Sequence, residues 1–235
     1  MLFESELSGR TGGDEITRER WPGFRLALWT RRFSVFTLKA FLFLRVPFAF
    51  GDSDSTDPGF EVFRDQCMAC HLETGLGIEA MKAPSIAGLP RWYVTDQLRK
   101  FRSDQRGFHS EDASGKLMQA NAVVLDERTI AFVGRHVENL APNPNRKTAV
   151  TESVDGSGNL YLQNCAECHG NDANGSRARR APPLTSQQDW YLLNQIENFR
   201  TGKRTHGEYG KGSELSPQEL KSIVSWIVDL PAGDE

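Results

Sequence analysis

Hydrophobic residues recur at helical spacing in three segments of the chain. In residues 90–102, 125–140 and 215–230, apolar side chains return every three or four positions, which is typical of a helix with one buried face. Asp126 and Ser216 stand where N-caps belong, and Pro217 follows at the first turn. No stretch of any length shows the alternation of a β-strand. The pattern therefore predicts an all-α fold.

The chain contains an internal duplication. Shifting it by 98 residues gives at least eleven identities in one register, which chance does not produce. Beyond Arg106 the offset changes to 90, because residues 125–140 match residues 215–230. The second copy has therefore lost 8 residues between Arg204 and Leu215. The matched positions are Cys67, Cys70, His71, Ala83, Pro84, Trp92, Tyr93, Gln97, Phe101, Arg102 and Arg106, which fall on Cys165, Cys168, His169, Ala181, Pro182, Trp190, Tyr191, Gln195, Phe199, Arg200 and Arg204.

The duplication divides the chain into predicted segments. Residues 56–141 and 156–231 are the two repeated domains, and residues 142–155, which are polar and contain Pro144, form the linker. Residues 1–51 carry 8 of the 28 basic side chains and end in a short apolar stretch before Ala49-Phe50-Gly51. They are interpreted as a signal peptide or a basic extension, so we expect an exported, periplasmic protein. The rest holds 20 basic and 26 acidic residues, which argues against nucleic-acid binding.

Each copy carries the spacing C-x-x-C-H. Cys67 and Cys70 precede His71, and the second copy repeats this arrangement with its own two cysteines and histidine, so the motifs use every cysteine of the chain. The spacing is typical of covalent c-type haem attachment, with two thioether bonds to Cys and iron ligation by His. A domain of about 80 residues has a small core, which a bound macrocycle would complete. A zinc site of four cysteines and a disulfide within each pair are the alternatives. Zinc does not account for the histidine after each pair, and no βαβ pattern supports a redox disulfide.

These residues carry a family resemblance. The two C-x-x-C-H motifs, "APSIAG" with "APPLTS", and "WYVTDQLRKFRSDQRG" with "WYLLNQIENFRTGKR" resemble di-haem class I cytochromes c of the cytochrome c4 type over about residues 56–231. The resemblance implies two small helical domains, each around one covalent haem (heme c), that transfer electrons in the periplasm. It also implies that the carbonyls of Pro84 and Pro182 orient the imidazoles of His71 and His169. It further places Phe63 against His136, and Tyr161 against Trp226.

Class I cytochromes complete the iron with a methionine before the last helix. Met118 lies seven residues before Leu125, where the family places this ligand, and His109 is the alternative for the first iron. The second copy has no methionine after His169. His206 is the leading candidate there, and Tyr209, Lys211 or an open iron are the other possibilities. A methionine ligand raises the reduction potential, so the first haem is predicted to have the higher potential.

Two functions fit these predictions. The first is an electron carrier without enzymatic activity of its own, between a quinol-oxidising complex and a terminal oxidase or nitrogen-oxide reductase. The second is the cytochrome subunit of a periplasmic oxidoreductase, or small-molecule redox chemistry at an open second haem. The matched arginines, Arg102 and Arg106 with Arg200 and Arg204, are either partners of the haem propionates or ordinary surface charges.

Overall fold

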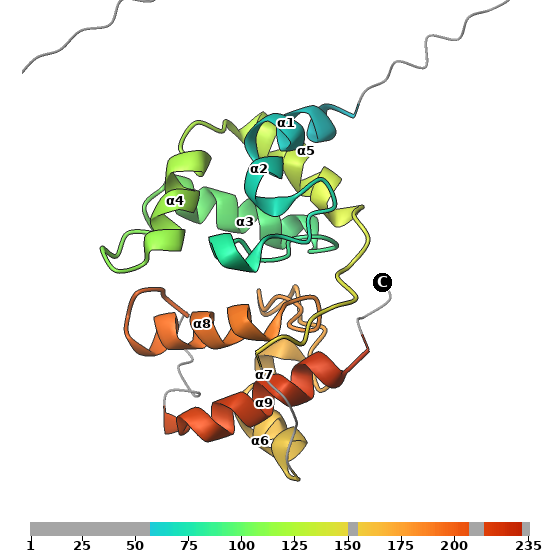
Figure 1. The fold of residues 1–235 in the computed structure, drawn as a ribbon, viewed down its shortest axis with the longest axis vertical. Coiled ribbons are helices and arrows are strands. Elements are labelled where there is room, and N and C mark those ends of the chain that lie inside the picture. Colours follow the sequence, from blue (N-terminus) through green and yellow to red (C-terminus); the bar gives the residue numbers. More distant parts are fainter. Residues whose placement is uncertain (1–56, 150–154, 207–213, 232–235) are drawn as a thin grey trace, which may run out of the picture. The chain divides into compact units, whose positions relative to one another are not determined.

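The computed structural model describes residues 57–149, 155–206 and 214–231, which form two helical halves (Figure 1). We call residues 57–149 the N-terminal half and residues 155–231 the C-terminal half. The described part of the chain contains helices and two isolated β-bridges but no strand. The predicted signal peptide or extension lies outside the described residues. Within them, no helix has both the length and the apolar character needed to cross a bilayer.

The N-terminal half consists of five α-helices and one 3-10 turn. Helices α1, α3 and α5 pack around a core that includes Phe63, Leu98 and Ile130. Helix α1 crosses α5 closely, because a Cβ at Gly59 would lie 2.4 Å from the carbonyl oxygen of Phe132. The elements are α1 (Pro58–Gln66), α2 (Met68–His71), η1 (Glu79–Met81), α3 (Arg91–Arg102), α4 (Ala113–Ala122) and α5 (Glu127–Glu138).

The C-terminal half repeats this plan with fewer elements. Helices α6 and α8 pack on α9 around Tyr161, Leu192 and Ile223, which are all buried. Ser216 caps α9 in a full capping box with Glu219, and Pro217 begins the helix, so this predicted helix start is confirmed. The elements are α6 (Ser157–Asn164), α7 (Ala166–His169), α8 (Asp189–Arg200) and α9 (Pro217–Asp229).

The duplication extends to the backbone conformation. The antiparallel bridge Ile78–Ala83 has its counterpart 98 residues later in Ser176–Ala181. Residues with positive φ also recur at this offset, and they include non-glycine residues such as Leu72, which matches Gly170, and Asp104, which matches Gly202. The two copies therefore share their turns as well as their helices.

Helix α4 is an element that the hydrophobic pattern did not predict. The carboxylate of Asp112 caps it by accepting a hydrogen bond of 2.9 Å from the N–H of Gly115. The helix places Met118 on an ordered element rather than in an irregular loop. In the C-terminal half, the described residues between α8 and α9 contain no α-helix, in agreement with the 8-residue deletion.

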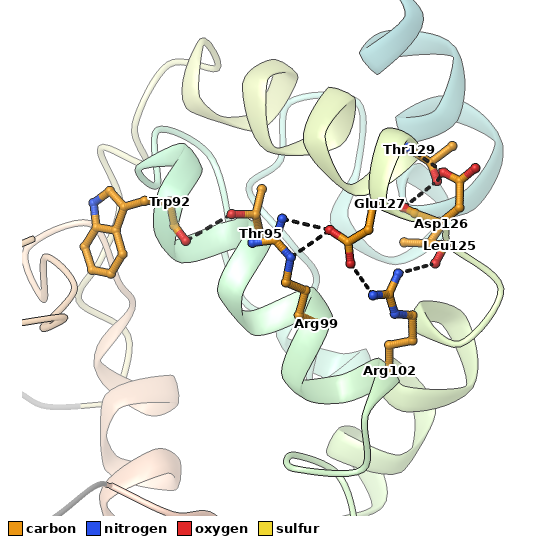
Figure 2. A network of polar contacts seen from close by, with 8 residues as sticks. All are labelled: Trp92, Thr95, Arg99, Arg102, Leu125, Asp126, Glu127 and Thr129. Atoms are coloured by element: carbon orange, nitrogen blue, oxygen red, sulfur yellow. Dashed lines mark hydrogen bonds and ion pairs between the residues drawn. The ribbon is translucent and has the colours of Figure 1, made fainter.

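Ion pairs cover the outer side of α3. Arg99 and Arg102 both bind the carboxylate of Glu127 at the start of α5, and Arg102 also donates to the carbonyl of Leu125 at 3.0 Å (Figure 2). The carboxylate of Asp126 accepts from the N–H of Thr129 at 2.7 Å, which confirms the predicted N-cap of α5. Arg102 is therefore a surface residue with a carboxylate partner.

Candidate functional site

The first C-x-x-C-H motif lies at the junction of two helices. Helix α1 ends at Gln66, Cys67 caps it, and the N–H of His71 donates to the carbonyl of Cys67 at 2.9 Å. One helical turn therefore carries both thiols and the imidazole. His71 is only 4% exposed, and its Nδ1 lies 2.9 Å from the carbonyl oxygen of Pro84. That contact directs Nε2, the second ring nitrogen, to act as a metal ligand.

A tight turn brings the Pro84 carbonyl to His71. Gly77 has a φ of +77°, and a Cβ at this position would lie 2.4 Å from the carbonyl oxygens of both Ala83 and Pro84. Only glycine combines this backbone conformation with so close an approach. The bridge between Ile78 and Ala83 then holds the segment that ends in Pro84.

The second motif has the same construction. The N–H of His169 donates to the carbonyl of Cys165 at 3.0 Å, and its Nδ1 lies 2.9 Å from the carbonyl oxygen of Pro182. Gly175 takes the place of Gly77, with a φ of +84° and the backbone of Pro182 at 2.6 Å from a hypothetical Cβ. The two sites therefore orient their histidines in one way.

Burial controls the protonation of these groups. Desolvation, followed by the neighbouring Cys70, raises the pKa of the Cys67 thiol to about 12, and desolvation with Cys168 raises that of Cys165 to about 11. Redox-active C-x-x-C pairs have lowered thiol pKa values, so these sites differ from them. Desolvation also lowers the pKa values of His71 and His169, which favours the neutral imidazole that binds metal.

The N-terminal half has a cavity beside the motif. Its wall includes Cys67, Cys70 and His71, with Leu98 and Phe101 of α3 among its apolar residues. Met118 of α4 also lines it and packs against the apolar core. The structure therefore brings together the predicted attachment residues, the predicted proximal histidine and the predicted methionine.

In the C-terminal half, His206 lies near His169. Their ring centroids are 6.3 Å apart, and the His206 ring also contacts Phe199 at 4.5 Å between centroids. The planes of the two imidazoles are inclined by 28°, and both rings would contribute a nitrogen ligand if a metal ion were bound between them. Tyr209 and Lys211, the other candidates for this iron, lie outside the described residues.

Other predicted contacts have clear positions. The ring of His136 packs on Phe63 at 4.9 Å between centroids, and the ring of Trp226 packs on Tyr161 at 4.8 Å, so both predicted pairs are confirmed. The half-buried His109 accepts a hydrogen bond from the N–H of Glu111 and does not line the cavity.

The structure gives no support to the zinc or disulfide alternatives. No disulfide joins any two of the four cysteines, all of which lie in the described residues. Among the described residues, no group of three or more His, Cys, Asp or Glu side chains lies close enough to hold a metal ion. A haem fits the observed residues better, because each motif combines two adjacent thiols with an imidazole that is oriented for ligation, and the N-terminal motif opens on an apolar cavity.

The two halves match known cytochrome families. Residues 56–133 match the family described as cytochrome c, and residues 153–227 match the family described as subunit III of cbb3-type cytochrome c oxidase. The thiosulfate dehydrogenase electron acceptor of Thiomonas intermedia is 25% identical over 70% of this chain and 78% of that protein. Cytochrome c-552 of Acidithiobacillus ferridurans is 24% identical over 86% of this chain and 88% of that protein.

Solved structures share the fold. Thiosulfate dehydrogenase TsdBA of Marichromatium purpuratum aligns with a TM-score of 0.58 and 29% identity over 73% of this chain, which spans 40% of that longer chain. Cytochrome c4 of Acidithiobacillus ferrooxidans aligns with a TM-score of 0.56 and 22% identity over 71% of this chain and 99% of that one. The described residues therefore form two tandem class I cytochrome c domains.

Each half therefore matches a cytochrome c family, and the chain as a whole is similar to di-haem class I cytochromes c of the cytochrome c4 type. It binds two c-type haems covalently, each with an iron, as the cofactors of its two domains. The proteins that it resembles include an electron acceptor of thiosulfate dehydrogenase, a cytochrome c-552 and a subunit of a cbb3-type cytochrome c oxidase.

Proposed function

We propose that this protein is an exported electron carrier with two haems of different reduction potential. Cys67 and Cys70 form the thioether bonds to the first haem, and Cys165 and Cys168 form those to the second. The position of each thiol pair directly before an oriented histidine supports this assignment. The basic and apolar character of residues 1–51 supports export to the periplasm.

His71 and His169 are the proximal ligands in this proposal. Met118 is the distal ligand of the first iron, and its place in the wall of the cavity that also contains Cys67 and His71 supports this role. His206 is the distal ligand of the second iron. Thioether ligation favours ferrous iron more than imidazole ligation does, so electrons collect on the N-terminal haem.

The ring pair of His169 and His206 is the observation that carries this proposal. Replacing His206 with alanine removes the only histidine of the described residues whose ring contacts that of His169. We expect the C-terminal haem to change from a low-spin spectrum to one that binds carbon monoxide in the reduced state, while the N-terminal haem keeps its spectrum. Optical redox titration of the unmodified protein should give two separate one-electron waves.

The change Met118→Ala is the matched variant. It should open the N-terminal haem to carbon monoxide and leave the C-terminal haem low-spin, because the two distal ligands lie on different halves. His109→Ala is the control and should change neither haem. A single unresolved wave in the unmodified protein, or carbon monoxide binding at half of its haem, would contradict the proposal.

A second candidate function is that of an electron acceptor for a sulfur-compound dehydrogenase. The similarity to thiosulfate dehydrogenase electron acceptors from two bacteria supports it. In this case the partner upstream is a dehydrogenase rather than a quinol-oxidising complex. Mixing the oxidised protein with a thiosulfate dehydrogenase and thiosulfate should reduce both haems within the turnover time of that enzyme.

The downstream partner is a terminal oxidase or a nitrogen-oxide reductase. The match of residues 153–227 to a subunit family of cbb3-type oxidases supports an oxidase in particular. Docking between such carriers and their partners is weak and fast, with a small interface. Oxidation of the reduced protein by membranes that contain the oxidase, in a stopped-flow experiment, is the corresponding measurement.

A further inference from the structure

The peptide group between Pro84 and Ser85 is held from two sides. Its carbonyl oxygen lies 2.9 Å from Nδ1 of His71, and this contact orients the imidazole. Its N–H donates to Oε1 of Gln188, a residue of the other half, at 2.8 Å. Because a peptide group is planar, the two hydrogen bonds act on one rigid unit. The side chain of Gln188 is therefore connected to His71 through a single peptide group.

Two further hydrogen bonds from the C-terminal half hold the same segment. We call residues 76–85, which bring the Pro84 carbonyl to the histidine, the proximal turn. Nε2 of Gln188 donates to the carbonyl of Leu76 at 3.4 Å, and Nε2 of Gln187 donates to the carbonyl of Ser85 at 2.9 Å. Ser85 is fully buried, and both glutamines are buried as well. Loss of one of these contacts therefore leaves a backbone group without a partner and out of reach of water.

The side chain of Gln188 does not stabilise the helix that it precedes. Gln188 occupies the N-cap position of α8, but its side chain forms no capping hydrogen bond with that helix. Glutamine is also not among the residues that are preferred at an N-cap. Its contacts with the proximal turn, rather than helix capping, account for a glutamine at this position.

The second motif lacks this connection. The counterpart of Ser85 is Pro183, whose nitrogen carries no hydrogen, so the peptide group after Pro182 has nothing to donate. The counterpart of Gln188 is Pro90, which has no side-chain acceptor. Both proximal histidines nevertheless have Nδ1 at 2.9 Å from a proline carbonyl. The two repeats therefore differ in the far side of that peptide group, and only the N-terminal repeat can be linked through it to the opposite half.

We propose that Gln188 is a positioning residue for the N-terminal haem, through which the C-terminal half strengthens the hydrogen bond to His71. A peptide group whose N–H donates is a stronger acceptor at its carbonyl oxygen, because hydrogen bonds in a chain polarise one another. The imidazole of His71 is then a more basic ligand, which lowers the reduction potential of the N-terminal haem. The effect rests on His71 as the proximal ligand of the proposed function, but on neither distal ligand.

The test is Gln188→Leu in the purified holoprotein, which removes the acceptor of the Ser85 N–H. We expect optical redox titration to show at least a threefold rise in the equilibrium constant for reduction of the N-terminal haem, which is about 28 mV at 59 mV per decade. The C-terminal haem is the internal control and should change less than threefold, because Pro183 has no N–H to lose. If Gln188→Leu does not yield holoprotein, Gln188→Met, which keeps the length of the side chain, replaces it.

Proton exchange gives a second readout, which separates this effect from a general loss of stability. NMR of the reduced protein follows the Nδ1 protons of His71 and His169 and the amide proton of Ser85. In Gln188→Leu, the protons of His71 and Ser85 should exchange with solvent at least threefold faster, while that of His169 keeps its rate. A general loss of stability would accelerate all three.

Glu111→Gln is the matched control at the junction of the halves. It removes the ion pair of 2.9 Å between Glu111 and Lys203 of the other half, which does not involve the proximal turn. It should change neither potential by as much as threefold. An equal shift of the N-terminal potential with Glu111→Gln would show that any loosening of the junction has this effect, and would overturn the proposal.

Three further results would overturn it: an N-terminal potential that stays within threefold, one that falls, or an equal shift at both haems. These results are separate from those that test the proposed function. Unresolved waves in the unmodified protein would refute the distal ligands proposed there. The exchange rates of the His71 and Ser85 protons would then still decide whether Gln188 holds the peptide group.

Discussion

The change Gly77→Ala tests how the backbone positions the proximal histidine. The new Cβ would lie 2.4 Å from the carbonyl oxygen of Pro84, where real Cβ atoms essentially never approach within 3.0 Å. The carbonyl must therefore move by about 0.6 Å. Its contact with Nδ1 of His71 would lengthen from 2.9 Å to about 3.5 Å, which is at the limit of a hydrogen bond.

The energetic cost has two parts. A residue other than glycine at a φ of +77° costs about 1–2 kcal/mol. Loss of the hydrogen bond to the buried His71 adds about 1 kcal/mol. We expect the free energy of unfolding to fall by about 2–3 kcal/mol. The imidazole also becomes a weaker donor to iron without the carbonyl partner, so the potential of the N-terminal haem should rise.

Guanidinium chloride unfolding of the holoprotein measures the first effect, and optical redox titration measures the second. Gly202→Ala is the control, because Gly202 has a φ of +72° and a Cβ there would meet no atom within 4 Å. Its free energy of unfolding should fall only by the backbone strain, about 1–2 kcal/mol, and the potential of the N-terminal haem should not change. Equal destabilisation by the two changes, with the potential unaltered in both, would refute this account of the turn.

Two smaller changes test the C-terminal half. Ser216→Ala removes the capping box at the start of α9, and we expect thermal or denaturant unfolding to show a loss of about 1 kcal/mol. An unchanged midpoint would mean that the cap does not contribute to stability. Tyr161→Phe removes a hydrogen bond of 2.6 Å from the hydroxyl to the carbonyl of Gly170, and it should cost about 1 kcal/mol in the same assay.

The sequence was sufficient to predict the helices that bury an apolar face. The segments around Leu98, Ile130 and Ile223 show a regular spacing because each packs its apolar side against protein, and all three residues are buried in the structure. The haem-attachment motifs could also be recognised from the sequence, because thioether chemistry fixes the spacing of their residues.

The hydrophobic pattern did not predict helix α4, and there is a physical reason for this. Of its residues, only Gly115 and Ala122 are buried, and Leu117 is 53% exposed, so its sequence has no wide apolar stripe. Leu117 and Met118 line the cavity beside Cys67, so this side of the helix is not fully packed against other side chains. The hydrophobic pattern of a helix reflects its contacts with other side chains. A helix that lines a cofactor cavity therefore has a weaker hydrophobic pattern.

In the sequence, Arg106 and Arg204 could be recognised only as matched positions of the two repeats. The offset of 98 residues pairs Arg106 with Arg204 and Tyr93 with Tyr191, but it does not say that each arginine reaches the tyrosine of the other half. Arg102 and Arg200 belong to the same matched set, and each pairs with a glutamate. The three-dimensional structure was needed to distinguish these arginines from the two that donate to a tyrosine of the other half.

The position of the deletion relates these features to one another. The offset of 98 residues holds through Arg204, and the 8 missing residues fall between Arg204 and Leu215. The contacts of Arg106 and Arg204 with the tyrosines of the opposite halves therefore match each other, although the segment after Arg204 is shorter than its counterpart. Arg204 is fixed by Gln195 and by the hydrogen bond of its N–H to Asn198, so it also holds the short segment that presents His206 beside Phe199. In the proposed assignment, the two haems have different distal ligands, and therefore different potentials, although the contacts of Arg106 and Arg204 between the halves are alike.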